Sequence, residues 1–297
     1  MSRRKNLLLC FDAFGTLIKP NQPVLKQYAT VAEQCGLGVL SISQLQASFK
    51  AAYKAESKAN PNFGKATGLG AEKWWGSIIT KTFSPFIDDD KKKALPFLTK
   101  KLLYRFSSSE GYDLAVSDLG SRLKRIKERG EQQGRQTIVG VITNSDDRIP
   151  GILTSLGGMD ISGFRYGQEG SRDVRKYDID FHCMSYDVGF TKPSNVIFDA
   201  GMAMGLELVD KGREGEEWTK VYVGDEVRND VLGASDAGWH SVLVLNEKEN
   251  GVGLDGVGDR IPEGLLDLGD QEVFLVNGIV RRMKASSLKQ VLEWFEK

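Results

Sequence analysis

A short apolar stretch close to the amino terminus constrains the fold more than any other feature. Residues 7–11 are five consecutive apolar side chains, too few for a helix and too uniform for a strand with one face in water. Such a run is typical of a strand buried on both faces of a parallel sheet. Asp12 follows the run, and Gly15 permits a tight turn just beyond it. Because ligands of open α/β sheets bind beyond the carboxyl ends of the strands, Asp12 is a candidate functional residue.

A single aspartate after a strand more commonly caps a helix or a turn. Three later stretches favour a functional role, because they also place polar side chains at strand ends or at a helix start. These side chains are Thr143 and Asn144 after the apolar run 137–142, Lys192 before Pro193, and Asp225 and Asp230 after the apolar run 221–223.

The order of these groups resembles the motifs of the haloacid dehalogenase superfamily, which are a nucleophilic Asp, a Thr or Ser, a Lys and an acidic pair. The match extends from residue 7 to about residue 245. The resemblance implies an α/β fold whose core is a doubly wound, Rossmann-like parallel sheet. We assign residues 1–19 and 113–297 to this core domain.

Between the first strand and the rest of the core, the pattern changes to helical periodicity. Apolar side chains recur at helical spacing in four successive segments, which turn-forming residues separate. The segments cover residues 24–35, 42–52, 75–83 and 95–106. They predict a helical insertion at about residues 20–112. In the superfamily, a helical cap domain at this point covers the active site and selects the substrate.

The segment 73–83 contains the paired Trp74 and Trp75. It resembles the subgroup called haloacid dehalogenase-like hydrolase domain-containing protein 3. The two tryptophans have two interpretations, core packing or contact with the substrate. Packing is favoured, because large aromatic side chains chiefly fill protein interiors.

The remaining segments predict an alternating core. Helices are expected at residues 119–126, 149–156, 195–204, 232–237 and 288–295, and strands at 181–185 and 241–245. Residues 158–177 are expected to form a surface loop or an irregular insertion, residues 210–220 a loop, and residues 247–270 a loop or a short appendage. His182 and His240 lie in apolar strand patterns, which favours packing over catalysis.

Composition narrows the classes of partner. Forty basic and forty acidic residues give a formal net charge of zero, so bulk electrostatics favour neither nucleic acid nor an anionic membrane as a partner. The three cysteines lie far apart, which is typical of a reducing compartment. The apolar run near the start is too short for a signal peptide, and no stretch approaches the length of a membrane span. We therefore expect a cytoplasmic protein.

The motif residues predict a magnesium site. A carboxylate nucleophile and a phosphoryl group repel each other, so a cation is needed to bring them together. Asp12, Asp225 and Asp230 supply the hard oxygen ligands that Mg²⁺ prefers, and Phe14 can add its backbone carbonyl. By resemblance, these are the metal-binding positions of the family.

The other motif residues match the family's catalytic and substrate-binding positions. The Thr143 hydroxyl and the Asn144 amide can donate hydrogen bonds to the transferring phosphoryl oxygens, and Lys192 adds a fixed positive charge. The resemblance then implies that Asp12 becomes an aspartyl phosphate, which water hydrolyses. A small phosphorylated molecule is the expected substrate.

Phe14 departs from this pattern. Phosphatases of the superfamily usually carry there a second Asp, which protonates the leaving oxygen and then activates water. Losing a general acid/base costs about a hundred- to ten-thousand-fold in rate. Alkyl phosphates should therefore be poor substrates, while acyl phosphates, aryl phosphates and phosphoanhydrides should suffer less, since their leaving groups need no proton.

Two alternatives stay open. The segment 11–17 also resembles the first motif of the 2-haloacid dehalogenases, which carry an aromatic residue at the position of Phe14 and use no metal. The acidic pair and the absence of an early arginine in the helical insertion argue against that chemistry. A nearly silent member that binds a phosphorylated ligand or a protein partner is the other alternative.

Overall fold

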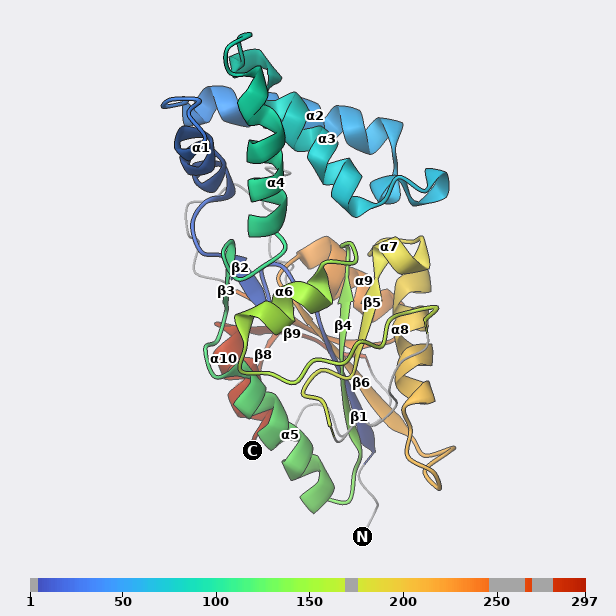
Figure 1. The fold of residues 1–297 in the computed structure, drawn as a ribbon. Coiled ribbons are helices and arrows are strands. Elements are labelled where there is room, and N and C mark those ends of the chain that lie inside the picture. The colour runs from blue at the N-terminus through green and yellow to red at the C-terminus, as the bar shows by residue number, and fades with distance from the viewer. Residues whose placement is uncertain (1–4, 169–175, 246–264, 269–279) are drawn as a thin grey trace.

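A seven-stranded parallel sheet forms the centre of the molecule (Figure 1). The structure is a computed structural model and describes residues 5–168, 176–245, 265–268 and 280–297. The strands lie in the order β5-β4-β1-β6-β7-β9-β8. Their bounds are β1 Asn6–Phe11, β4 Thr137–Thr143, β5 Phe181–Met184, β6 Trp218–Gly224, β7 His240–Val244, β8 Leu266–Asp267 and β9 Arg282–Ala285.

Strand β1 lies in the interior of this sheet, between β4 and β6. Its Leu9 pairs with Val139 on one side and with Val221 on the other, and all six strand residues are buried. Alternate side chains belong to two different hydrophobic clusters, with Leu8 and Cys10 in the smaller one. The predicted burial of this strand on both faces is therefore confirmed.

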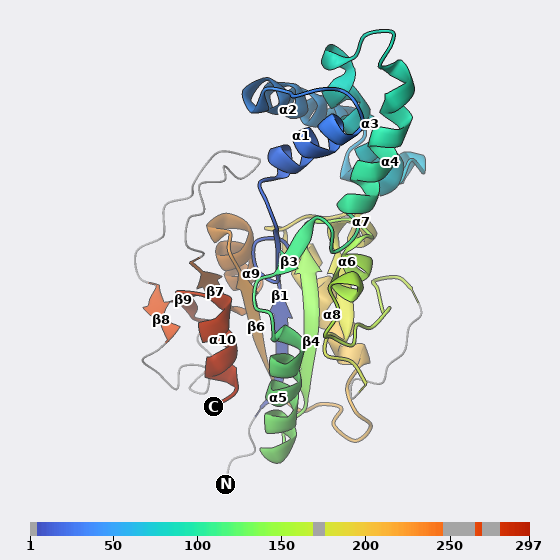
Figure 2. The same cartoon turned by 60° about the vertical axis from the view of Figure 1, so that its left-hand side comes forward.

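Helices cover both faces of the sheet, which confirms the doubly wound α/β class (Figure 2). Apolar side chains of α5 (Leu119–Gln132), α6 (Ile149–Leu156) and α10 (Leu288–Phe295) join the larger cluster on one face. On the other face, α8 (Asn195–Glu207) and α9 (Gly233–Asp236) contribute to the smaller cluster. The short α7 (Ser185–Val188) follows β5, and a π-helical segment, η4 (Val227–Leu232), leads into α9.

Four helices lie together beyond the carboxyl ends of the strands (Figures 1 and 2). They are α1 (Val24–Gln34), α2 (Ile42–Ala59), α3 (Ala71–Phe83) and α4 (Leu95–Arg105), with the 3₁₀ segments η1 (Asn62–Thr67), η2 (Ser84–Phe86) and η3 (Lys92–Ala94) between them. We call residues 24–105 the helical unit. An antiparallel pair of short strands, β2 (Ile18–Pro20) and β3 (Tyr112–Leu114), connects the unit to the sheet at both of its ends.

Two predicted loops are wrong in part. Strand β6 begins at Trp218, inside the segment expected to be a loop, and β8 lies inside the segment 247–270. Pairing with neighbouring strands decides both cases: Trp218 pairs with Asn6, and β8 pairs with β9. In the segment 158–177, Arg165 forms an isolated bridge to His182 and Phe164 is buried, so its described part packs on the core. Residues 169–175, 247–264 and 269–270 of these segments lie outside the described residues.

Within the described ranges, no helix combines the length and the apolar character that crossing a membrane requires.

Candidate active site

Asp12 comes directly after β1, at the edge of the sheet that faces the helical unit (Figure 1). Its backbone N–H donates to the carbonyl of Val223 in β6 at 2.8 Å, which extends the strand pairing by one residue. The residue is only 7% exposed. A carboxylate held at this depth needs a charged partner, because an unpaired buried charge is strongly unfavourable.

Lys192 is that partner. Its Nζ donates to Asp12 Oδ1 at 2.8 Å, to Asp230 Oδ1 at 2.6 Å and to the Tyr222 hydroxyl at 2.8 Å. Burial alone would lower the pKa of Lys192, but the carboxylates of Asp12 and Asp230 more than offset burial and raise this pKa above its usual value. The ammonium group therefore stays charged at the centre of the site.

Tyr222 is a site residue that the sequence did not reveal. Its hydroxyl donates to the carbonyl of Ile142 at 2.6 Å and accepts from Lys192, so it fixes the ammonium group from the side of β6. The side chain is fully buried. A hydroxyl inside the apolar run 221–223 was the available signal, since buried polar groups are almost always hydrogen-bonded.

Three carboxylates converge beside Lys192. Asp12, Asp225 and Asp230 each offer an oxygen, and these oxygens lie within 4.8 Å of one another. Burial and the neighbouring carboxylates raise the pKa of Asp225 to about 8. Burial also raises the pKa of Asp230 to about 6, although Lys192 lowers it. When all three acids are ionised, their negative charge exceeds the one positive charge of Lys192, and hard oxygen ligands in this arrangement fit a divalent cation.

Two glycines make room for these carboxylates. Gly15 has a φ of +83°, and a Cβ at this position would overlap the carboxylate of Asp225. A Cβ on Gly224 would overlap the carboxylate of Asp230. The Thr16 hydroxyl donates to Asp225 Oδ1 at 3.3 Å from the same turn. The turn after β1 and the end of β6 are therefore shaped around the acidic pair.

Asn144 and Thr143 follow β4 at the same edge. The Asn144 amide donates to the Lys192 carbonyl at 3.0 Å and accepts from the Lys192 backbone N–H at 2.6 Å. Both ends of this amide are engaged, so Asn144 fixes the backbone that carries the lysine. The Thr143 side chain is buried at the end of the strand. The structure therefore brings together every predicted site residue at one edge of the sheet.

A family model described as haloacid dehalogenase-like hydrolase matches residues 7–238, a range that contains all of these residues. The chain belongs to the haloacid dehalogenase-like hydrolases. It is 31% identical over 238 residues to an uncharacterized hydrolase of Schizosaccharomyces pombe. This alignment covers 80% of this chain and 90% of the relative. It is 29% identical over 265 residues to haloacid dehalogenase-like hydrolase domain-containing protein 3 of Bos taurus. This alignment covers 89% of this chain and 90% of the relative. The predicted superfamily and subgroup are confirmed.

Solved structures agree on the fold. The HAD-hydrolase YfnB from Bacillus subtilis bound to magnesium has a TM-score of 0.51 at 13% identity and covers 99% of this chain and 100% of its own. The 2-haloacid dehalogenase from Pseudomonas syringae also has a TM-score of 0.51, at 17% identity, and covers 97% of each chain. A fold that a magnesium-bound hydrolase and a dehalogenase share does not select between their chemistries.

Phe14 is the residue at which this hydrolase departs from the superfamily's phosphatases. Its half-buried ring packs on Tyr112 of β3, with the ring centroids 5.3 Å apart. The side chain therefore fills the space beside the connection to the helical unit and supplies no proton donor.

The two histidines are packed, as predicted. His182 in β5 is fully buried, and neither ring nitrogen has a hydrogen-bond partner among the described residues. Burial, with a smaller effect of Arg165, lowers the pKa of His182 to about 3, so the ring stays neutral. His240 Nδ1 accepts from the backbone N–H of Arg281 at 3.2 Å, at the start of β7.

Proposed function

We propose that this hydrolase is a magnesium-dependent phosphatase that works through an aspartyl phosphate on Asp12. The convergence of Asp12, Asp225 and Asp230 on the single ammonium group of Lys192 carries the proposal. Three carboxylates and one ammonium group leave two negative charges, which match a divalent cation. Burial is the largest cause of the raised pKa values of Asp225 and Asp230, and repulsion from the neighbouring carboxylates adds to it.

Bound Mg²⁺ would be held by the three carboxylates, with the Phe14 carbonyl as a further ligand, and would neutralise phosphoryl charge. Lys192 contacts Oδ1 of Asp12, which leaves Oδ2 for attack on phosphorus. The new bond joins Oδ2 to phosphorus, and the bond from phosphorus to the leaving oxygen breaks. Water then attacks phosphorus, which releases phosphate and restores the carboxylate of Asp12.

Thr143, Asn144 and Lys192 complete the catalytic and substrate-binding set in this proposal. The Thr143 hydroxyl would donate to the transferring oxygens, and Lys192 would balance the charge that develops on them. Asn144 contributes to the same set by holding the backbone of Lys192.

The Phe14 side chain directs the substrate preference. Since no acid follows Asp12 at the second position, the leaving group must depart without a proton. Acyl phosphates, aryl phosphates and phosphoanhydrides meet this requirement, whereas alkyl phosphates do not.

The helical unit is the cap in this proposal, at about residues 20–112 over a core of residues 1–19 and 113–297. Its place beyond the carboxyl ends of the strands supports this assignment (Figure 2). The cysteines Cys10, Cys35 and Cys183 are free thiols, which supports a reducing compartment such as the cytoplasm.

Hydrolysis of acetyl phosphate and p-nitrophenyl phosphate, with Mg²⁺ and with a chelator, tests the proposal. We expect turnover that needs the metal and that Asp12→Asn abolishes. Chloride release from 2-chloropropionate in the chelator, without phosphatase activity, would instead establish the dehalogenase chemistry that Phe14 favours. Magnesium binding without turnover of either substrate class would indicate the nearly silent alternative.

A further inference from the structure

A buried ion pair joins the helical unit to the loop after β4, three residues beyond the Thr143 of the candidate site. Asp146 is 1% exposed. Arg148 donates from Nε to Asp146 Oδ1 at 2.7 Å and from Nη2 to Oδ2 at 2.7 Å. The arginine backbone N–H adds a third bond to Oδ1 at 3.1 Å. This two-pronged pairing fixes both side chains in one geometry.

The pair contacts two different helices of the helical unit. Trp75 of α3 donates its indole N–H to Asp146 Oδ2 at 2.9 Å, and its ring centroid lies 5.0 Å from the guanidinium carbon of Arg148. Arg148 also donates from Nη1 to the carbonyl of Phe106, directly after α4, at 3.0 Å. A single ion pair of the core therefore holds both α3 and the end of α4.

The Asp146 side chain is charged in this arrangement. Burial would raise the pKa of Asp146, but Arg148 and the Trp75 indole lower this pKa below its usual value. Loss of any one donor would leave a buried carboxylate with too few partners, which is costly. The ion pair therefore favours the arrangement in which Trp75 and Phe106 both stay in contact with it.

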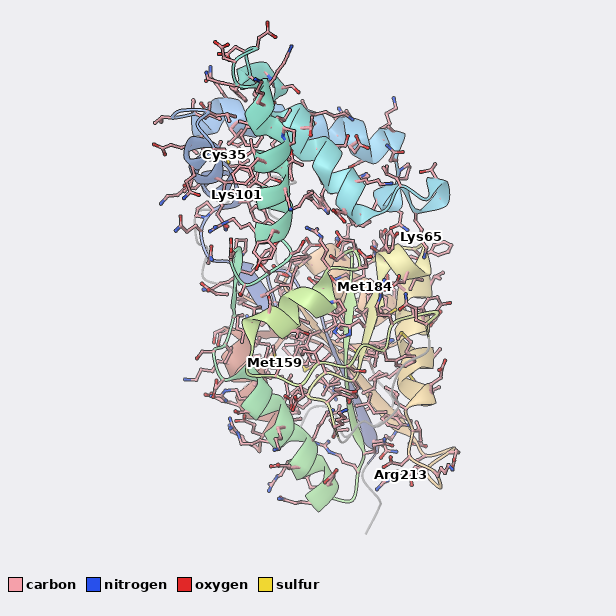
Figure 3. All side chains as sticks on the ribbon, viewed as in Figure 1. Cys35, Lys65, Lys101, Met159, Met184 and Arg213 are labelled. Carbon is pink, nitrogen blue, oxygen red and sulfur yellow. The ribbon has the colours of Figure 1, made fainter. Side chains whose placement is uncertain are left out.

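A second set of contacts between the helical unit and the core lies at α7 and is more exposed to solvent. Lys65 of η1 donates to the carbonyl of Asp187 at 2.6 Å and lies over the ring of Tyr186, and Figure 3 shows Lys65 at the side of the helical unit that faces α7. Asn62 donates to the carbonyl of Tyr186 at 3.3 Å. Lys65 is exposed, so these contacts hold the helical unit less strongly than the buried ion pair does.

We propose that Asp146 and Arg148 are positioning residues that clamp the helical unit over Asp12 through Trp75 and Phe106. The clamp acts on catalysis through its neighbours: Asp146 lies two residues after Asn144, which holds the backbone of Lys192. Placing the helical unit and placing the lysine are thus coupled through one short loop. The effect of the clamp on turnover rests on the proposed phosphatase function, whereas its effect on the arrangement of the unit does not.

A pair of tryptophan variants tests the clamp. Trp75→Phe removes the indole donor and leaves the ion pair intact, so this variant should fold. Trp74→Phe is the matched control, because the Trp74 indole donates at 2.9 Å to the carbonyl of Asn60, within the helical unit. Asp146→Asn serves as a second variant that weakens the clamp from the core side.

The position of the helical unit is measured by pulsed electron spin resonance between two labels. One label is placed on the native Cys35, which directly follows α1 (Figure 3), and the other on Ala203→Cys, exposed on α8. The remaining cysteines are buried. The parent and Trp74→Phe should give one narrow distance distribution, whereas Trp75→Phe and Asp146→Asn should give broad or shifted ones.

Kinetics with acetyl phosphate and Mg²⁺ complete the test. We expect kcat/KM to fall about tenfold or more in Trp75→Phe and to stay close to the parent value in Trp74→Phe, since small displacements of positioned groups are costly in rate. Unchanged distances in Trp75→Phe, or equal broadening in both tryptophan variants, would overturn the clamp. If the parent hydrolyses no phosphate, the proposed function fails and the distances alone decide the clamp.

Discussion

At the residue scale, one lysine organises the site. Lys192 contacts Asp12, Asp230 and Tyr222 through its ammonium group, while Asn144 holds its backbone. The site has a fixed cation and a surplus of carboxylates, and it lacks the proton donor that Phe14 displaces. The missing donor and the surplus of carboxylates can each be tested by a single substitution.

The Phe14→Asp variant should gain a general acid. We expect hydrolysis of alkyl phosphates to rise about a hundredfold or more, because proton donation by a positioned acid contributes about 10²- to 10⁴-fold. Hydrolysis of acetyl phosphate should rise less, since acetate leaves without a proton and only the later attack of water gains from the new group. Phe14→Asn is the control, as it also removes the ring that packs on Tyr112. Equal rates for the Asp and Asn variants would contradict the prediction.

Asp225→Asn should stabilise the metal-free protein at high pH. The pKa of Asp225 is raised to about 8, above its value of about 3.9 in the unfolded chain, so the folded state binds the proton more tightly. The free energy of unfolding of the parent therefore falls as pH rises from about 4 to 8.

Thermal melts in chelator at pH 6 and pH 8 measure this dependence. The parent should lose stability between the two pH values, and Asp225→Asn should lose less of it. A variant that melts below the parent at pH 8 would contradict the raised pKa of Asp225 in the folded state.

At the scale of single elements, the turn after β1 determines where Asp225 lies. Gly15 combines a positive φ with close approach to the Asp225 carboxylate, and both features exclude a side chain. The conformation alone costs a residue with a Cβ about 1–2 kcal/mol. A Cβ at this position would also displace the Asp225 carboxylate.

Gly15→Ala should therefore weaken Mg²⁺ binding as well as stability. Gly212→Ala is the matched control, since Gly212 has a φ of +87° and no atom within 4 Å of the position that a Cβ would take. Calorimetric titration with Mg²⁺ should show at least a tenfold loss of affinity in the first variant and none in the second. Equal affinities in both variants would show that Gly15 is needed only for the backbone conformation of the turn.

The sequence predicted those elements whose pattern is local. Strand β1 is a continuous apolar run, so its burial on both faces can be predicted from its own residues alone. Strand β9 was not predicted, although Arg282, Met283, Lys284 and Ala285 alternate as in a half-buried strand. Strand β8 has two residues and exists because β9 lies beside it, so no local pattern could reveal it.

The residues of the candidate site also divide into those that a local pattern predicts and those that depend on distant partners. Asp12, Lys192 and the acidic pair follow strand ends or precede a helix, and a motif pattern predicts them. Tyr222 and Trp75 depend on partners 30 and 71 positions away, which only the folded chain brings into contact. Sequence spacing therefore predicts the reacting groups better than the groups that position them.

At the scale of the whole molecule, the helical unit lies beyond the sheet edge that carries the three carboxylates (Figure 2). Mg²⁺ bound to the three carboxylates should stabilise the folded chain, because a ligand at a hundred times its Kd adds about 2.7 kcal/mol to the free energy of unfolding. Melting temperatures with Mg²⁺ and with chelator measure this gain at pH 8. Asp230→Asn, which removes one of the three clustered carboxylates, should abolish the gain, and a gain equal to that of the parent would contradict the site.

The covalent step through Asp12 is tested most directly by trapping it. The protein is mixed with acetyl phosphate and Mg²⁺, quenched within the first turnovers, and treated with borohydride, which reduces an aspartyl phosphate to homoserine. Peptide mass spectrometry should locate homoserine at position 12, only in samples that received both acetyl phosphate and Mg²⁺. Phosphate release without any modification at position 12 would contradict the aspartyl-phosphate route.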